Sequence, residues 1–522
     1  MTAAAFDVPA VLVPDYVALH GRNQPRKAAL ICGDEQTAWG EFAAKLDRVA
    51  GALRAHGIGR GDKVGILVDN SIQGIEAYFG TLRAGAAVAS LSSIVADDAL
   101  ELMIEDSESK LVIASAPHER KIDAMRPRLK RLATDAYVGI GATGSGWQPY
   151  TAWRDCAAPV EVGVNAPNDD ACLIYSSGTT GVPKGITLTH FCRLNHGLVM
   201  GNAMRYAQDS VVLVTTALYS NTAWTLLLCG FIPGCTVVVM PKFDAGEWCR
   251  LVERWQVTHT IMVPTQFQMI LESAELKRRD LSSLESLCTV GSLMREAMKR
   301  QISETFSCGL YEVYGLTEGF ATLLRPSDPP EKWGSVGQAM IGNDLRVIDD
   351  HGRELPWGEA GEIVGYSPIL MRGYYNKPDK TTEAIWREPK SGRTFLRSGD
   401  IGRFDADGYF YLLDRKKDMI VSGGYNVYPA DIERVLGGHP DVHDVVVIGV
   451  PHPKWGETPL GLVIRRPGAM ADAEALRTWA NARLGKHQRI HAIEWRDQFP
   501  RNAGGKVLKR ELRAPYWPSG SD

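Results

Sequence analysis

The sequence predicts an α/β protein with a large N-terminal domain of layered sheets and helices and a small α+β domain after it. Its 522 residues are more than one ordinary hydrophobic core organises. Short apolar, β-branched runs alternate with amphipathic stretches of helical period, which favours layers built on largely parallel sheets. Near residue 400 this alternation gives way to turn signals and clustered charges, which indicates a second domain.

The alternation is clearest in the middle of the chain. Apolar runs at 211–215, 236–240 and 260–263 are short and rich in valine, so we expect buried strands there. Residues 246–255 place tryptophan, leucine and valine at helical spacing, and 265–276 predict another helix. We interpret nearly all of these apolar stripes as core packing.

The domain boundary is expected in the charged segment 414–418. The predicted domains are residues 1–413, with the nucleotide and acyl sites, and residues 419–522, joined by that segment as a hinge. A turn is expected just before it, at the DADG of residues 405–408. The elements expected after it are a helix from Pro429, strands at 445–450 and 460–466, and a helix over 471–484.

Composition excludes several classes of protein. Hydrophobic residues make up 45% and charged residues 23%, as in soluble globular proteins, and the net charge of -3 gives no reason to expect nucleic acid as a partner. Nine cysteines without a C-x-x-C pair indicate reduced thiols in a cytoplasmic protein and no structural zinc. Apolar stretches are broken by glycine and proline, so no integral membrane segment is expected. A homodimer is left open.

The strongest motif lies at residues 170–190, DACLIYSSGTTGVPKGITLTH. An apolar strand runs into a loop in which glycines free the backbone N–H groups, hydroxyls add donors and a lysine adds charge, a combination that suits a polyphosphate. The order of a Walker A loop is absent. The plain alternative is a flexible surface loop. The candidate nucleotide-binding residues here are Ser176, Ser177, Gly178, Thr179, Thr180, Gly181 and Lys184.

This string resembles the phosphate loop of the adenylate-forming superfamily, which includes acyl-CoA synthetases, nonribosomal-peptide adenylation domains and beetle luciferases. Further motifs follow in the order of that superfamily, and the resemblance covers residues 12–515. The matching segments are Tyr311-Glu312-Val313-Tyr314-Gly315-Leu316-Thr317-Glu318, Gly361-Glu362-Ile363, Arg372-Gly373-Tyr374, Ser398-Gly399-Asp400, Asp414-Arg415-Lys416-Lys417-Asp418 and Asn502-Ala503-Gly504-Gly505-Lys506.

The resemblance implies a role for each motif in binding ATP. Tyr314 offers a flat face to adenine, with Glu312, Val313 and Gly315 beside it. Asp400 is expected to bind the ribose hydroxyls and Arg415 the ribose or a phosphate. The implied magnesium ligands are Thr180 and Glu318, which offer hard oxygen donors. The residues assigned to catalysis on this basis are Thr317 and Glu318.

The C-terminal motifs imply a domain that moves between two half-reactions. Lys506 is expected to bridge the carboxylate and the α-phosphate during adenylation. Lys417 is the implied pivot, and rotation about it exchanges the Lys506 face for the loop Ser422-Gly423-Gly424. Glycine there removes the side-chain obstruction to the pantetheine arm of coenzyme A. A plain turn is the alternative interpretation of that loop.

The implied acyl pocket departs from the family pattern at one position. Relatives often carry P-L-F-H where this chain has Ala217-Leu218-Tyr219-Ser220, so Ser220 replaces a histidine that often orients the carboxylate. These segments contain no charged partner for a second carboxylate or an amine, which disfavours dicarboxylates and amino acids. The alternative is that these side chains only pack the core. The expected lining is Tyr219, Ser220, Asn221, Trp224, Gly291, Ser292, Gly315 and Phe320.

The resemblance therefore implies an ATP-, Mg²⁺- and coenzyme A-dependent acid–CoA ligase that forms an acyl-adenylate. The expected acid is a hydrophobic monocarboxylate, either aromatic, such as a hydroxycinnamate or benzoate, or a medium- or long-chain fatty acid. A stand-alone enzyme that loads a carrier protein is the alternative. An oxidative, luciferase-like role has little specific support, and a nucleotide-binding relic is disfavoured because the motif residues are complete.

Overall fold

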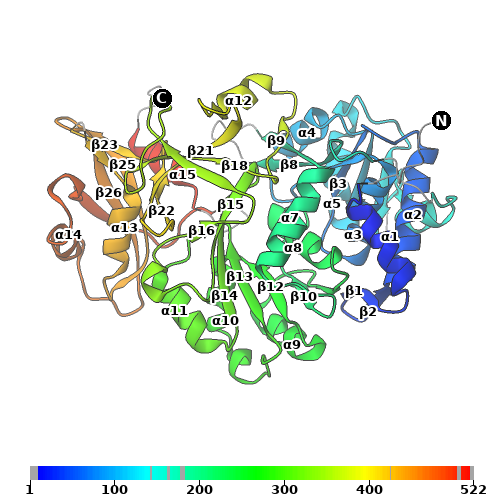
Figure 1. The fold of residues 1–522 in the computed structure, drawn as a ribbon, viewed down its shortest axis with the longest axis horizontal. Helices are drawn as coiled ribbons and strands as arrows, with labels where there is room; N and C mark the ends of the chain where they lie inside the picture. The colour runs from blue at the N-terminus through cyan, green and yellow to red at the C-terminus, as the bar shows by residue number, and fades with distance from the viewer. Residues whose placement is uncertain are drawn as a thin grey trace.

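Four sheets form the framework of the protein (Figure 1). The computed structural model describes residues 10–141, 144–160, 165–176, 183–423, 425–501 and 507–517. Within these residues, two large sheets of eight and nine strands make up most of the N-terminal part, a five-stranded third sheet follows, and a five-stranded C-terminal sheet completes the chain.

The eight-stranded sheet, called here the first sheet, has the order β19-β9-β8-β4-β3-β5-β6-β7. Its strands pair in parallel from β8 through β7, whereas β9 and β19 are antiparallel additions at one edge. The strands are β3 (Lys63–Leu67), β4 (Ala87–Ser90), β5 (Leu111–Ser115), β6 (Tyr137–Ile140), β7 (Gln148–Pro149), β8 (Asp170–Ser176), β9 (Lys184–Thr189) and β19 (Gly373–Tyr374).

The nine-stranded second sheet has the order β16-β15-β14-β13-β12-β10-β11-β1-β2 and is parallel except at its two edges. The expectation of largely parallel sheets is confirmed. Its strands are β1 (Ala28–Cys32), β2 (Glu35–Ala38), β10 (Val211–Val214), β11 (Thr236–Val239), β12 (His259–Met262), β13 (Ser286–Val290), β14 (Gly309–Leu316), β15 (Gly319–Leu324) and β16 (Gln338–Ala339).

The third and C-terminal sheets are built mainly from antiparallel pairs. A single parallel pair, β26 with β27, closes the C-terminal sheet. The strands of the third sheet are β17 (Asp344–Ile348), β18 (Gly361–Tyr366), β20 (Ile385–Arg387), β21 (Thr394–Phe404) and β22 (Phe410–Arg415), and those of the C-terminal sheet are β23 (Ile420–Ser422), β24 (Tyr425–Val427), β25 (Val442–His452), β26 (Gly456–Arg465) and β27 (Ala492–Trp495).

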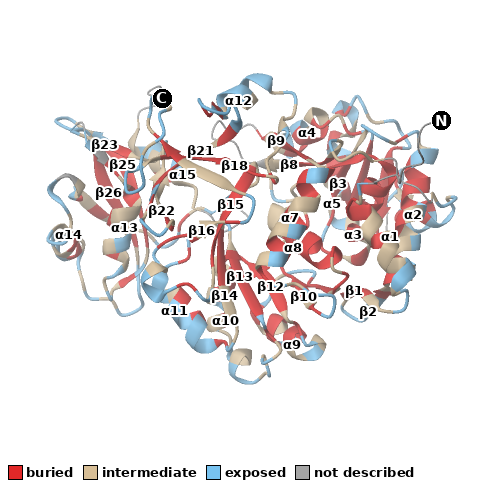
Figure 2. Cartoon of the chain, in the orientation of Figure 1, coloured by how far each residue is buried: buried red, intermediate tan, exposed pale blue. Residues whose placement is uncertain are grey.

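Helices cover the sheets, and Figure 2 shows their outer faces exposed while the strands of the large sheets are mostly buried. No helix among the described residues is long and apolar enough to cross a membrane. The helices are α1 (Val13–Asn23), α2 (Trp39–Ala55), α3 (Ile72–Ala84), α4 (Asp97–Asp106), α5 (Ala116–Met125), α6 (Tyr150–Asp155), α7 (His190–Ala203), α8 (Asn221–Phe231), α9 (Ala245–Trp255), α10 (Pro264–Leu271), α11 (Glu296–Thr305), α12 (Pro378–Glu383), α13 (Pro429–Gly437), α14 (Ala473–Asn481) and α15 (Lys509–Arg513).

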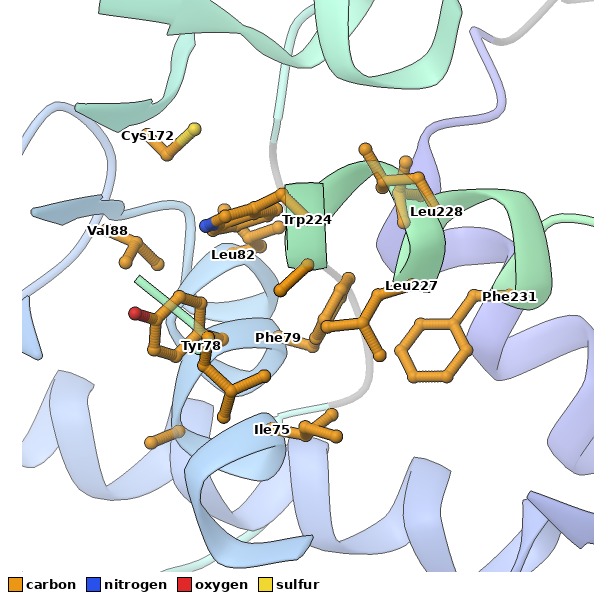
Figure 3. Packing of buried hydrophobic residues seen from close by; sticks show 14 of the residues in the cluster. Ile75, Tyr78, Phe79, Leu82, Val88, Cys172, Trp224, Leu227, Leu228 and Phe231 are labelled. Atoms are coloured by element: carbon orange, nitrogen blue, oxygen red, sulfur yellow. The ribbon is translucent and has the colours of Figure 1, made fainter. Parts of the chain in front are cut away.

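The largest core joins α3 and α8 (Figure 3). The apolar stripe of α3 follows the i, i+3, i+4, i+7 pattern of an amphipathic helix. Its aromatic rings meet those of α8, with the Phe79 and Phe231 centroids 4.8 Å apart and the Tyr78 and Trp224 centroids 5.3 Å apart. The stripe consists of Ile75, Tyr78, Phe79 and Leu82. Trp224 is thus held rigidly in the first turn of α8.

Most predicted elements occur within a residue or two of the expected bounds. The helix expected over 265–276 is shorter, because α10 ends at Leu271 and a 3₁₀ turn, Ala274–Lys277, follows it. The Ser273 hydroxyl accepts a hydrogen bond from the Glu275 N–H at 3.3 Å, and this local bond competes with continuation of the helix.

Candidate active site

Three parts of the fold meet around the hairpin of β8 and β9. Strand β19 pairs with β9, with Tyr374 opposite Ile186. The Met371 N–H donates to the Glu318 carbonyl at 2.7 Å, so the segment before β19 also holds the turn that joins β14 to β15. Backbone pairing therefore brings the predicted phosphate lysine, Lys184, and the predicted magnesium ligand, Glu318, to one place.

Tyr374 links these two residues through its side chain. Its hydroxyl donates to the Glu318 carboxylate at 3.0 Å, and the Lys184 ammonium lies 5.3 Å from the centroid of its ring. Burial and the nearby Glu318 charge raise the pKa of the Tyr374 phenol, so the hydroxyl keeps its proton and remains a donor. A cation, a ring and a carboxylate thus form one connected group.

A second group joins the second and third sheets. Asp400 on β21 lies opposite Arg415 on β22, and its two carboxylate oxygens contact the Arg415 guanidinium at 3.0 Å and the Tyr314 hydroxyl at 2.7 Å. Burial, together with the smaller effect of the Asp400 charge, raises the pKa of the Tyr314 phenol well above its usual range. The Tyr314 hydroxyl therefore also remains a hydrogen-bond donor. Each carboxylate oxygen has two lone pairs, so Asp400 retains acceptor capacity for hydroxyl ligands.

The residues present fit a magnesium ion held partly by phosphates. Among the described residues no group of three His, Cys, Asp or Glu side chains could hold a metal. Magnesium commonly takes one or two carboxylates together with substrate phosphates. Glu318 supplies one such carboxylate, and its contact with Tyr374 engages a single oxygen. Thr180, the other predicted ligand, lies outside the described residues.

Glu312, predicted to lie beside the adenine, has its carboxylate buried in the structure. One oxygen accepts a hydrogen bond from the Met294 N–H at 2.8 Å, and the other forms an ion pair with the buried Lys299 of α11. Burial raises the pKa of Glu312 despite that partner. Val313 is also buried, whereas Gly315 is exposed. Of these three neighbours of Tyr314, Gly315 therefore presents its backbone most openly.

The predicted acyl-pocket residues divide into two sets. Trp224 and Phe320 have no exposed surface and belong to hydrophobic cores, which fits the alternative that they only pack. The other six predicted positions are exposed or half-buried, and Gly291 has a φ of 94°, a backbone conformation that favours glycine. These six are Tyr219, Ser220, Asn221, Gly291, Ser292 and Gly315.

Ser220 and Asn221 have different partners at the start of α8. The Ser220 hydroxyl caps the helix by accepting from the Ala223 N–H at 3.2 Å. The Asn221 Oδ1 accepts from the Arg193 guanidinium at 2.8 Å. Sequence analysis missed Arg193, because it stands alone on α7, 28 residues before Asn221, and only the packing of α7 against α8 brings it there.

Comparison with known proteins gives the family. A model of the AMP-binding enzyme family matches residues 17–375, and a model of the AMP-binding enzyme C-terminal domain matches residues 431–506. The chain belongs to the AMP-binding enzyme family.

Relatives of this AMP-binding enzyme match along nearly its whole length. The feruloyl-CoA synthase of an Amycolatopsis species is 32% identical over 95% of this chain and 97% of its own. A long-chain-fatty-acid–CoA ligase of Mycobacterium tuberculosis is 32% identical over 92% and 94%. The ATP-bound structure of MatB from Rhodopseudomonas palustris superposes with a TM-score of 0.87 at 28% identity, over 97% and 99% of the two chains. These matches confirm the adenylate-forming resemblance, the two-domain α/β fold and an AMP-forming acyl-CoA synthetase.

The predicted hinge of the AMP-binding enzyme is a tight turn. The Asp418 and Met419 N–H groups both donate to the Arg415 carbonyl, and the Lys417 carbonyl accepts from Arg513 at 3.2 Å. Beyond it, Gly423 has a φ of 59°, and a Cβ there would lie 2.8 Å from the Trp455 ring. Ser422 ends β23. The boundary and the pivot itself remain predictions.

One carboxylate of the AMP-binding enzyme contacts two arginines that are far apart in the sequence. Asp444 on β25 forms an ion pair with Arg295, the residue just before α11, and accepts from Arg501 at 2.6 Å. Arg501 pairs with Val507 in a backbone bridge that flanks the predicted catalytic segment. The predicted site residues that lie outside the described residues are Ser177, Gly178, Thr179, Thr180, Gly181, Gly424 and Lys506.

Proposed function

We propose that the protein converts a hydrophobic monocarboxylate to its acyl-CoA in two steps at one site. The acid carboxylate attacks the α-phosphate of ATP, forming acyl-AMP and releasing pyrophosphate. The thiol of coenzyme A then attacks the acyl carbon, and AMP leaves. The observation that best supports this proposal is the Lys184–Tyr374–Glu318 group. It joins a lysine that is suited to binding phosphate with a carboxylate that is suited to binding magnesium. We place the reaction in the cytoplasm.

The described residues bind and orient in this proposal. Asp400 accepts hydrogen bonds from ribose hydroxyls, and Arg415 and Tyr314 hold that carboxylate in place. Lys184 offsets the negative charge of the phosphates as the carboxylate approaches them. Mg²⁺, when bound at Glu318, would neutralise charge on the phosphate oxygens. Lys506 is proposed to stabilise the first step, and the loop at Ser422 and Gly423 to admit the pantetheine arm in the second.

The proposed acid is aromatic or a fatty acid. The partly exposed candidate lining, Tyr219 to Asn221 and Gly291 to Ser292, consists of neutral residues. Such a lining suits an acyl group that carries no charge besides the reacting carboxylate. The relatives support this choice, since the names of two of them give a feruloyl group and a long-chain fatty acid as the substrates.

A panel of cinnamates, benzoates, C6 to C16 fatty acids, malonate and phenylalanine, assayed for AMP and pyrophosphate with and without coenzyme A, tests the proposal. We expect turnover with cinnamates or fatty acids that requires coenzyme A. Glu318→Gln should abolish pyrophosphate release, whereas the exposed Glu304→Gln, a matched control on α11, should not. Preference for malonate or phenylalanine would overturn the substrate class. Acyl-AMP that accumulates without transfer to coenzyme A would favour loading of a carrier protein.

A further inference from the structure

Three charged side chains meet where the third sheet leads into the C-terminal part of the chain. The Lys509 ammonium on α15 lies 3.0 Å from the Glu433 carboxylate on α13 and 3.7 Å from the Asp414 carboxylate on β22. The exposed fractions of these side chains are 18%, 24% and 8%, respectively, so all three are mostly buried. Buried charges are costly unless they are paired. One cation therefore has to balance two carboxylates.

The two carboxylates lie on opposite sides of the predicted hinge, residues 414–418. Asp414 lies on β22, which pairs with β21 in the third sheet. Glu433 belongs to α13, which packs against both β22 and β25 of the C-terminal sheet, and its carboxylate also accepts from the Val447 N–H on β25 at 2.7 Å (Figure 1). Helix α15 packs against β25 as well. The contact of Lys509 with Glu433 is thus internal to the C-terminal part, whereas its contact with Asp414 crosses the hinge.

The charges of this cluster oppose one another in pairs. Burial alone would lower the pKa of Lys509, but Glu433 and Asp414 raise it above its usual range, so the ammonium stays charged. Burial is the main factor that raises the pKa of Asp414 to about 6, while Lys509 lowers it and Glu433 and Asp418 raise it. Asp414 and Glu433 therefore repel each other across the hinge. The Asp414 Oδ2 is buried without a hydrogen-bond partner among the described residues, so Lys509 is what offsets its charge.

Helix α15 contacts the hinge at a second point. Lys509 and Arg513 are four residues apart, so they lie on the same face of this helix. The Arg513 guanidinium donates to the Lys417 carbonyl at 3.2 Å. One face of α15 therefore contacts residues at the beginning and near the end of the hinge segment.

In the same arrangement the C-terminal part docks beside the proposed nucleotide site. Asp444 of the C-terminal sheet pairs with Arg295. The residue before it, Met294, donates its N–H to Glu312, which lies in the nucleotide motif. The cluster around Lys509 thus belongs to an arrangement in which the C-terminal part lies against the segment that carries this motif.

We propose that Lys509 is a positioning residue for acyl-AMP formation, because by neutralising Asp414 and Glu433 together it holds the C-terminal part of the chain in the described arrangement. Rotation about the predicted pivot, Lys417, would separate Asp414 from both other charges and remove the need for this cation. Lys509 acts through the arrangement of the two parts and not through contact with ATP or the acid. The inference rests on the proposed function and adds to it a residue that serves the first half-reaction only.

Lys509→Met tests the proposal, because it removes the shared cation and leaves two carboxylates facing each other. At pH 8, where Asp414 is ionised, pyrophosphate release in acyl-AMP formation should fall by about tenfold. Transfer from supplied acyl-AMP to coenzyme A should stay within about twofold of the wild-type rate, since a contact shifts an equilibrium only toward the state that contains it. Lys509→Arg should retain the wild-type ratio of the two rates. Arg434→Met, which removes a cation paired with Asp431 within α13, is the matched control and should also retain it.

A double variant separates this role from a role in folding. Lys509→Met combined with Asp414→Asn has no ionised carboxylate opposite Glu433 at position 414, so adenylation should recover to within about threefold of the wild type. Damage to packing from loss of the lysine side chain would not be repaired in this way. Thermal unfolding establishes that each variant folds, and Lys509→Gln, which keeps a donor for Glu433 but no charge, replaces Lys509→Met if the latter does not.

Two results would overturn the inference while leaving the proposed function intact. One is a wild-type ratio of the half-reaction rates in folded Lys509→Met, and the other is an absence of recovery in the double variant. A wild-type enzyme that releases no pyrophosphate with any acid of the panel would instead overturn the proposed function, and this inference with it.

Discussion

Removal of the Tyr374 hydroxyl tests the link between Lys184, the proposed phosphate ligand, and Glu318, the proposed metal ligand. Tyr374→Phe keeps the ring beside Lys184 and deletes only the 3.0 Å bond to Glu318. A hydrogen bond to a charged group contributes about 1.5–3 kcal/mol, and each 1.4 kcal/mol is a factor of ten. We therefore expect kcat/KM for ATP in acyl-AMP formation to fall by roughly ten- to a hundredfold. Transfer from supplied acyl-AMP to coenzyme A should change little.

The next residue provides a matched control for this experiment. The Tyr375 hydroxyl donates to the Glu108 carboxylate at 2.6 Å, so Tyr375→Phe removes the same kind of bond away from the proposed site. Both variants should lose a similar amount of stability, up to about 1.5–3 kcal/mol. Pyrophosphate release at varied ATP concentration, with thermal unfolding in parallel, measures both effects. Equal adenylation rates in the two variants would refute the assignment of Tyr374 to the site.

Three further predictions concern the C-terminal motifs and pH. Lys506→Ala should greatly slow acyl-AMP formation while transfer from supplied acyl-AMP persists, and an equal fall in both half-reactions would contradict its assignment to adenylation. Lys417→Pro fixes φ and removes an N–H, so adenylation should survive and thioester formation should collapse, whereas unchanged overall turnover would exclude Lys417 as the pivot. Burial lowers the pKa of His190 and His259 to about 4 and that of His196 to about 3, so the unfolded state binds more protons below about pH 6.5 and stability must fall as the pH falls. Urea unfolding at pH 7 and pH 5 should differ by about 2 kcal/mol for each histidine, and replacement of the buried His259 by glutamine should reduce that difference.

The sequence predicted the elements whose residues pack locally. Strands such as β10 and β11 were placed within a residue, because a run of valines indicates a buried strand without reference to the rest of the chain. Motif order was equally informative for Asp400 and Arg415, which the β21–β22 pairing sets opposite each other. In both cases the deciding partners are close in the sequence.

Roles that depend on distant partners were not predictable. The sequence identifies Tyr374 only as part of a motif, because its contacts arise from the pairing of β19 with β9, almost two hundred residues earlier. Glu312 was assigned to the nucleotide, and no pattern in the sequence indicated that Lys299 and Met294 would occupy its carboxylate. Arg193 was missed for the same reason, since a single arginine on a helix with no other arginine, lysine or acidic residue has no signature of its own.

The double contact of Asp444 has a consequence for how the enzyme can change. This one carboxylate holds Arg295 of the large domain and Arg501 at the base of the segment that carries Lys506. A mutation at Asp444 is therefore expected to alter two properties together, namely how tightly the small domain docks and how Arg501 is held next to the segment proposed to carry the catalytic Lys506. Neither can be tuned through this residue without the other. Variants that separate docking from anchoring must be sought at the two arginines, each of which serves only one side of that contact.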